Sequence, residues 1–167
     1  MLAVNHTASS ETQPASAEDI CMSNKLEPID ETFDLRQAFI DAFGIDIGED
    51  IEIAYKGRMK EIHAGDDVSI FVFPGLKAEA TNLDTGEEFS FNATGAQHQT
   101  IVRDEDGNIQ EIEYRLTGHN SVFTLDENGD PTFLLLKGNY TLSFNPDGSP
   151  RDPLEGHGNM TDLLDIL

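Results

Sequence analysis

The chain has no tryptophan and only one cysteine, Cys21, among its 167 residues. A single cysteine cannot form a disulfide within the chain, so the fold has to depend on its packed core. No apolar run reaches the roughly 18 residues that a transmembrane helix needs, and we expect no membrane span. Basic residues are also scarce, since 10 lysines and arginines stand against 32 aspartates and glutamates, for a net charge of -22. Such a surface repels phosphate backbones, and nucleic acid is therefore not an expected partner.

The first part of the chain lacks hydrophobic periodicity and is rich in Ser, Thr, Ala, Glu and Pro. This composition predicts a disordered tail at residues 1–27, followed by a single β-barrel domain at residues 28–167. The first lysine is Lys25, and no sufficient apolar stretch precedes it. As given, the sequence carries no recognisable export signal, and it leaves the localisation and the oligomeric state open.

One short helix is predicted near the start of the folded part. Apolar residues recur with helical spacing through "FDLRQAFIDAF", residues 33–43. Thr32 or Asp34 would cap this helix at its start, because both side chains can accept a hydrogen bond from a free backbone N–H group. Gly44 would end it.

After Gly48 the pattern is typical of β-strands. Apolar and polar residues alternate in "IEIAY", "LKAEAT", "EEFSFNA" and "EIEYRL", as in strands with one buried face and one wet face. Asp or Asn precedes a glycine in "LDTG", "DEDGN", "DENGD" and "NPDGS", which is the composition of tight hairpin turns. The sequence therefore predicts a mainly β fold, an antiparallel meander. We expect it to close into a barrel of roughly eight strands, because closure leaves no strand edge exposed.

A second series of glycines falls between those turns. Its members are Gly95, Gly118, Gly138 and Gly158. They either make the opposite-end turns of the meander or bend long strands. Even-numbered apolar residues stay in phase through Gly138, as one bent strand requires, whereas the phase shifts between Leu116 and Phe123, as a bulge or a turn would give. We favour bends and bulges in a curved barrel wall.

Several motifs resemble a family of small, mostly secreted bacterial β-proteins that is common in actinobacteria. They are "DETF", "FPGLKAEATNLDTGEEFSFNATGAQHQT", "RLTGHN", "LLKGNYTLSFNPDGSPRDPLEGHG" and "MTDLL", and the similarity runs from about Pro28 to the C-terminus. The resemblance implies a β fold without an established activity, and no catalytic residue to carry over. That family has a cysteine near the end of its first conserved segment and another in a C-terminal "TDLC". Here "DAFGIDI" and the pair Leu163 and Leu164 stand at those places, which fits the loss of a disulfide and puts the secreted location in doubt.

No metal or cofactor motif stands out. "VRDEDGNIQEIE" aligns with a calcium-binding EF-hand loop at Gly107, but Val102 takes the place of the first aspartate, and a hairpin turn explains the segment better. The histidines form neither an HExxH motif nor a pair two residues apart, so we expect no metal and no other cofactor. They are His6, His63, His98, His119 and His157. His119 and His157 would converge if their strands were neighbours. The sequence contains no GxSxG elbow, and whether the protein is an enzyme stays open.

The interior of the predicted barrel is the default site, because barrels of this size can hold one small ligand. Residues on the apolar face would line it: Tyr55, Phe89, Phe91, His98, Tyr114, Phe123, Tyr140 and Phe144. The alternative is a filled core in which each tyrosine hydroxyl finds a backbone partner.

Three functions follow from this reading. The first is a binding protein for a small apolar molecule. The second is a cofactor-free cyclase or isomerase for a reactive lipid-like or polyketide-like substrate, polarised by Tyr114 or His98; allene oxide cyclase and dirigent-type barrels are an analogy at the level of fold only. The third is a surface interaction module whose barrel is only a scaffold, which an exposed apolar patch would favour.

Overall fold

A computed structural model describes residues 26–167, and these residues form nine strands and one helix. In chain order the elements are β1 (Glu27–Asp34), α1 (Leu35–Phe43), β2 (Ile51–Gly65), β3 (Val68–Val72), β4 (Lys77–Asn82), β5 (Glu88–Asn92), β6 (Ala96–Arg103), β7 (Ile109–Leu125), β8 (Pro131–Phe144) and β9 (Pro150–Asp162). The strands pair in the order β5-β4-β2-β3-β6-β7-β8-β9, and β1 also pairs with β2. The predicted antiparallel meander with one short helix is confirmed.

The sheet does not close through its strand pairings. Among the described residues it has nine strands, not roughly eight, and no pairing joins its two ends, β5 and β9. Exposed strand edges invite pairing with other chains, and natural sheets blunt them with short strands and prolines. Here β5 has only five residues, and β9 carries Pro150 and Pro153. The fold thus limits its open edges without becoming a paired barrel.

The helix begins and ends at residues that the sequence predicts. Asp34 is the N-cap, and its side chain accepts a hydrogen bond of 3.0 Å from the backbone N–H of Gln37. Gly44 ends the helix in the left-handed conformation, with a φ of 71°. No helix within residues 26–167 is long and apolar enough to cross a membrane.

The segment before the helix is a strand that the sequence did not predict. Most of the predicted tail lies outside the described residues, but its last residue, Glu27, begins β1. Only Ile29 and Phe33 in β1 turn apolar side chains toward the core, too few for a clear alternation. The segment forms a strand because it pairs with β2, and its own sequence pattern does not show this.

The hairpin turns follow the predicted chemistry. Gly86, Gly107, Gly129 and Gly148 all have positive φ values of 77–86°. In the β6–β7 turn, the Asp104 side chain accepts hydrogen bonds from the backbone N–H groups of Asp106 and Asn108, at 3.0 and 2.8 Å. An aspartate ahead of the glycine therefore fixes the turn, and "DEDGN" is a hairpin turn.

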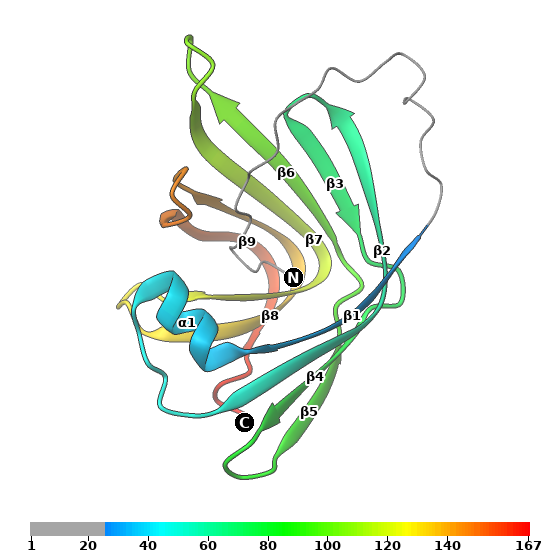
Figure 1. Ribbon diagram of the computed structural model, residues 1–167, viewed down its shortest axis with the longest axis vertical. Coiled ribbons are helices and arrows are strands. Elements are labelled where there is room, and N and C mark those ends of the chain that lie inside the picture. Colours follow the sequence, from blue (N-terminus) through cyan, green and yellow to red (C-terminus); the bar gives the residue numbers. More distant parts are fainter. Residues whose placement is uncertain (1–25) are drawn as a thin grey trace.

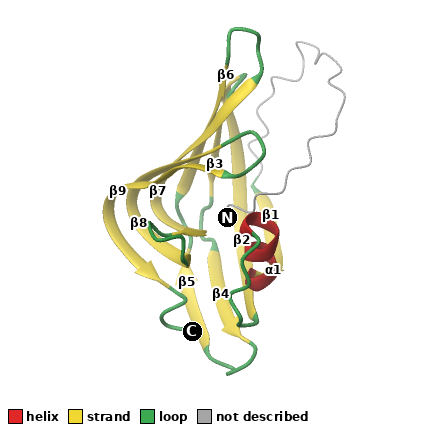
Figure 2. Ribbon diagram, turned by 90° about the vertical axis from the view of Figure 1, so that its left-hand side faces the viewer, coloured by secondary structure: helices red, strands yellow, loops and turns green. Residues whose placement is uncertain are grey.

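The long strands bend in the middle. β7 and β8 have 17 and 14 residues, and Figure 1 shows them curving together with β9 as one C-shaped band. Two further segments bend in the same way: one consists of β3 and β4, and the other of β5 and β6. The two segments run side by side, because β3 pairs with β6 and β4 pairs with β5. In Figure 2, β7, β8 and β9 bow out on one side of the molecule, while α1 lies on the other side beside β1 and β2.

The second series of glycines marks this bend. Gly118 pairs with Gly138, and Gly138 pairs with Gly158, so three of the four stand in one row across β7, β8 and β9. Gly95 abuts that row, because a Cβ added to Gly118 would meet the Gly95 Cα at 3.3 Å. The backbones approach one another too closely here for side chains. The predicted bends are confirmed.

The expectation of a bulge or a turn at Gly118 is wrong. The register between β7 and β8 runs without a shift from Ile112 to Leu125. The apolar phase changes along β7 because the strand is buried on both faces. Leu116 belongs to one core and Phe123 packs against another on the opposite face.

The two cores lie on opposite faces of β7 and β8. The first is formed by β1, β2, β4, β5, α1, the C-terminal residues and one face of β7 and β8. The second comprises Leu116, Val122, Leu136, Tyr140, Leu142 and Phe144. Its members come from both sides of the glycine row, so it fills the concave side of the bend. On β8, Phe133 and Leu136 are 1% and 0% exposed, one in each core.

Candidate functional site

The structure does not bring the eight predicted site residues into one interior. Tyr55, Phe89, Phe91 and Phe123 lie in or against the first core, whereas Tyr114, Tyr140 and Phe144 lie in or against the second. His98 belongs to neither core and pairs across the strands with Ile70 and Arg115. The aromatic rings of the first core pack on one another, with centroids 6.4 Å apart for Tyr55 and Phe91. In place of the single predicted interior there are two cores, and the protein's own side chains pack in each.

Two of the three tyrosine hydroxyls bond to side chains, whereas a filled core was expected to offer them backbone partners. The Tyr55 hydroxyl and the Ser121 Oγ lie 2.6 Å apart in the first core, and burial raises the pKa of Tyr55 to about 12. The Gln99 amide donates to the Tyr114 hydroxyl at 3.0 Å. Within the described residues the buried Tyr140 hydroxyl has no partner, and neither does the buried Gln97 Nε2.

Tyr55→Phe is expected to lower the free energy of unfolding by about 1–2 kcal/mol, because it leaves the buried Ser121 hydroxyl without a partner. Urea denaturation of the wild type, Y55F, S121A and the double variant measures this cost. The double variant should cost about 1 kcal/mol less than the sum of the two single variants. Strictly additive costs would contradict a hydrogen bond that contributes to stability.

The histidines do not converge. His119 pairs with Lys137 and His157 pairs with Asn139, with β8 lying between the two histidine-bearing strands. In the part of the chain that the structure describes, no group of three or more His, Cys, Asp or Glu side chains is placed to hold a metal ion. His6 and Cys21 lie outside the described residues.

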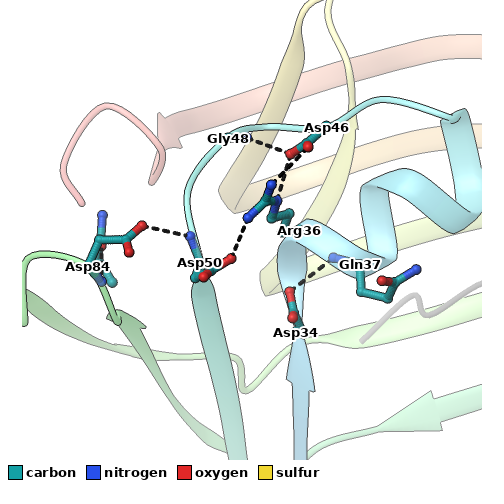
Figure 3. A network of polar contacts seen from close by, with 8 residues as sticks. Asp34, Arg36, Gln37, Asp46, Gly48, Asp50 and Asp84 are labelled. Carbon is teal, nitrogen blue, oxygen red and sulfur yellow. Dashed lines mark hydrogen bonds and ion pairs between the residues drawn. The ribbon is translucent and has the colours of Figure 1, made fainter.

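An arginine clamp holds the loop between α1 and β2 (Figure 3). Arg36 donates two hydrogen bonds to Asp46, at 2.7 and 2.9 Å, and a third to Asp50 at 2.7 Å. The backbone N–H of Asp50 in turn donates to Asp84, in the turn between β4 and β5, at 3.2 Å. Each of the three aspartates accepts a hydrogen bond from Arg36 or from the backbone, so this acidic cluster ties two loops together.

The same contacts predict how stability depends on pH. The Arg36 guanidinium, and after it the Gly48 backbone N–H, lower the pKa of Asp46 from 3.8 to about 2. Turn hydrogen bonds also lower the pKa values of Asp104, Asp126 and Asp147, most strongly those from Asn108, Asp130 and Ser149 respectively. Because folding depresses these pKa values, the stabilisation is present above the ordinary carboxyl pKa and is lost as the pH falls. For Asp46 that loss extends down to about pH 2.

Asp46→Asn is therefore expected to be less stable than the wild type at pH 7, with a difference that shrinks between about pH 4 and pH 2. Urea denaturation across that range measures it. In the Arg36→Gln background the Asp46→Asn difference should change less with pH, because the main cause of the lowered pKa is gone. A difference between wild type and D46N that is constant from pH 7 to pH 2 would contradict the clamp.

A hollow of about 270 Å³ opens beside the first core, where the end of β5 meets β7, β8 and β9. We call it the Asn92 hollow, and it is lined by Asn92, His119, Leu135, Lys137, Asn159 and Thr161. Its centre is a row of three cross-strand neighbours, because His119 pairs with Lys137 and Lys137 pairs with Asn159. Leu135 and Thr161 form the next row. Asn92 approaches this surface from the end of β5.

The polar side chains of the Asn92 hollow have no partners among residues 26–167. Asn92, His119, Lys137, Asn159 and Thr161 make no side-chain hydrogen bond or ion pair there. Some of the other cations are engaged, as in the ion pair of 2.7 Å between Arg103 and Asp67. The hollow therefore presents five unused polar side chains to one space.

A second hollow, of about 490 Å³, lies on the other side of Asn92. We call it the lysine hollow; its lining includes Lys56 and Lys77, which are direct cross-strand neighbours on β2 and β4. It also contains Glu79, which accepts a hydrogen bond of 3.4 Å from Ser90. Asn92 thus lies between two cationic surfaces in a strongly acidic chain.

The sequence did not predict the Asn92 hollow, although a signal for it was present. His119 follows Gly118, Lys137 precedes Gly138, and Asn159 follows Gly158. The glycine series was interpreted as bends, but the polar residues beside each glycine were not grouped. Once those glycines are known to pair, their polar neighbours must fall in one row.

Comparison with known proteins adds no relative to this description. No protein-family model, no curated protein and no solved structure matches the chain. The resemblance to a bacterial β-protein family stays a prediction from the motifs. Leu164, which stands at the cysteine position of the "TDLC" motif, and Ile47, in the "DAFGIDI" segment, both pack against the first core.

Proposed function

We propose that this is a non-catalytic binding protein that holds its ligand in the Asn92 hollow, on the outside of the bent sheet. One observation carries the proposal: five polar side chains line a single hollow and none of them has a partner in the described chain. Pre-placed polar groups around a concave surface are the usual basis of ligand specificity. The two packed cores then serve as the scaffold that positions the strands.

The composition of the Asn92 hollow favours binding over catalysis. Catalytic nucleophiles depend on an adjacent base that a third group orients. Here the direct cross-strand neighbour of His119 is Lys137, and no carboxylate lines the hollow to orient the imidazole ring. The side-chain amides, the hydroxyl and the ammonium can instead donate hydrogen bonds to a ligand.

The side-chain amides of Asn92 and Asn159 provide the test. We expect that a screen of small polar molecules by ¹H–¹⁵N NMR will find compounds that shift both amide signals in a saturable way. The Asn128 amide, which is held in a turn by Asp126 at 3.2 Å, is the internal control and should not move. Asn159→Ala should weaken such a compound. A screen that leaves both amides unmoved would overturn the proposal.

A second candidate is the binding of a small apolar molecule in the second core. It is favoured by the buried Tyr140 hydroxyl and Gln97 Nε2, which lack partners in the described residues. Gln97 pairs with Leu116, and Leu116 pairs with Tyr140, so both polar groups stand in one row on the concave face. A ligand with one polar end would satisfy them, after displacing side chains that now fill this space.

Native mass spectrometry of the protein from its own host separates the two candidates. A retained small apolar molecule that Tyr140→Phe loosens and Asn159→Ala does not would favour the second core. A bound species lost only with Asn159→Ala would favour the Asn92 hollow. The cyclase or isomerase function stays a prediction, and its substrate would likewise have to displace side chains of the second core.

A further inference from the structure

We propose that the ligand of the Asn92 hollow carries an oxyanion, either a carboxylate or a phosphate group. This inference rests on the proposed function and names the chemistry that the hollow recognises. Its basis is the charge and hydrogen-bonding character of the lining, taken together with the charge of the whole chain. Cations are rare in the chain as a whole, which has 10 lysines and arginines among 167 residues.

The lining offers donors and a cation, and no carboxylate. Lys137 contributes an ammonium group, Asn92 and Asn159 contribute amide N–H groups, and Thr161 contributes a hydroxyl. Oxyanions bind where several such donors surround them, and a charged donor makes the stronger hydrogen bonds. A neutral ligand would leave the Lys137 charge without a counter-charge.

The Asn92 hollow differs from two other hollows of this acidic chain in having a lysine and no carboxylate in its lining. A third hollow, beside Gly95, is lined by no charged residue, whereas two others contain carboxylates. The lysine hollow includes Glu79, and a hollow near the β8–β9 turn includes Glu111, Glu113, Asp152 and Glu155. The Asn92 hollow is thus locally positive within a field that is negative overall, which directs an anion to one place.

The neighbouring lysines strengthen this field. Lys56 and Lys77 are directly opposite each other on β2 and β4, an arrangement that costs stability when both side chains are charged. Neither forms an ion pair within residues 26–167. Their charges act on the Asn92 hollow from the far side of Asn92. An anion in the hollow, or a second anionic group of the same ligand above the lysines, would relieve this repulsion.

The size of the hollow indicates the scale of the ligand. About 270 Å³ is close to the lower limit of small-molecule pockets. Most of the exposed lining is apolar and includes Leu135, which suits a short carbon skeleton next to the charged group. The structure therefore points to a small organic acid or a small phosphorylated compound.

The experiment uses the full chain with acetate, inorganic phosphate and, as a control, chloride at matched ionic strength. The side-chain amides of Asn92 and Asn159 should shift saturably with acetate or with phosphate, and not with chloride. The anion that saturates at the lower concentration identifies the source of the oxyanion. Lys137→Gln should weaken that binding by about fivefold, the effect of losing one charge-assisted hydrogen bond.

Two further variants keep the test decisive. Arg58→Gln removes the same charge from the same strand face as Lys56 but outside both hollows, and it should weaken binding by less than about twofold. Asn159→Asp places a carboxylate in the lining and should abolish oxyanion binding, with the folded spectrum as the check on structure. Equal weakening by K137Q and R58Q would overturn the proposal, because the anion would then respond only to overall charge.

The two proposals fail in different ways. If neither acetate nor phosphate shifts the two amides but a neutral compound does, the oxyanion proposal is overturned and the binding function stands. If no compound shifts them, both are overturned. Saturable shifts that depend on Lys137 and not on Arg58 support both.

Discussion

Gly95→Ala is expected to lower the free energy of unfolding by about 2–4 kcal/mol, the cost of forcing an atom into a closely packed site. A Cβ at this position would lie 2.5 Å from the His119 carbonyl oxygen and 2.6 Å from that of Thr117. It would also lie 2.3 Å from the Asn120 Nδ2, which donates to the Thr117 carbonyl at 3.0 Å. Backbone oxygens cannot rotate away, so β6 and β7 would have to separate at the bend.

Gly65→Ala is the matched control for this prediction. It also lies in a strand segment, but no atom comes within 4 Å of a Cβ added there, and its φ is not in the left-handed region. We expect its free energy of unfolding to stay within about 0.5 kcal/mol of the wild type. Urea denaturation compares the two variants. A Gly95→Ala protein as stable as Gly65→Ala would show that the bend does not depend on the close approach.

Phe133→Ala and Leu136→Ala are each expected to lower the free energy of unfolding by about 2–5 kcal/mol. The two residues point to opposite faces of β8, and they are 1% and 0% exposed. Each truncation would leave a cavity in a different core. A strand with one wet face would instead tolerate truncation at one of the two positions.

Lys137→Ala is the control, because this exposed residue lies directly after Leu136 on the same strand. Its cost should stay within about 0.5 kcal/mol. If both cores contribute to stability, the Phe133 and Leu136 variants should lose far more unfolding free energy than this control. A cost near zero at either buried position would contradict the picture of a strand buried on both faces.

Features set by neighbouring residues could be predicted from the sequence. The cap at Asp34, the end of the helix at Gly44 and the turn at Gly107 each follow from one side chain or one φ angle. The burial of Ile51, Ile53 and Tyr55 follows from simple alternation along β2. Local geometry decides these elements, so a local pattern is enough to find them.

Features set by distant residues could not be predicted in this way. Alternation assumes one buried face, but β7 and β8 have two, because β1, β2, β4 and β5 cover one face and the bend closes over the other. The predicted site joined Tyr55 and Tyr140 on the assumption of one interior, and the structure places them in different cores. The candidate site depends on the pairing of Gly118 with Gly138, which no single segment shows.

The pairing of β9 with β8 also decides what the molecule exposes to other copies of itself. β8 is apolar on both faces along much of its 14 residues, whereas β9 carries prolines, glycines and charged residues and is largely exposed. Edge strands of the first kind tend to recruit further strands and aggregate, and strands of the second kind resist it. β9 therefore protects β8 from pairing with other chains. A chain shortened before Pro150 would leave β8, which is apolar on both faces, as the edge of the sheet.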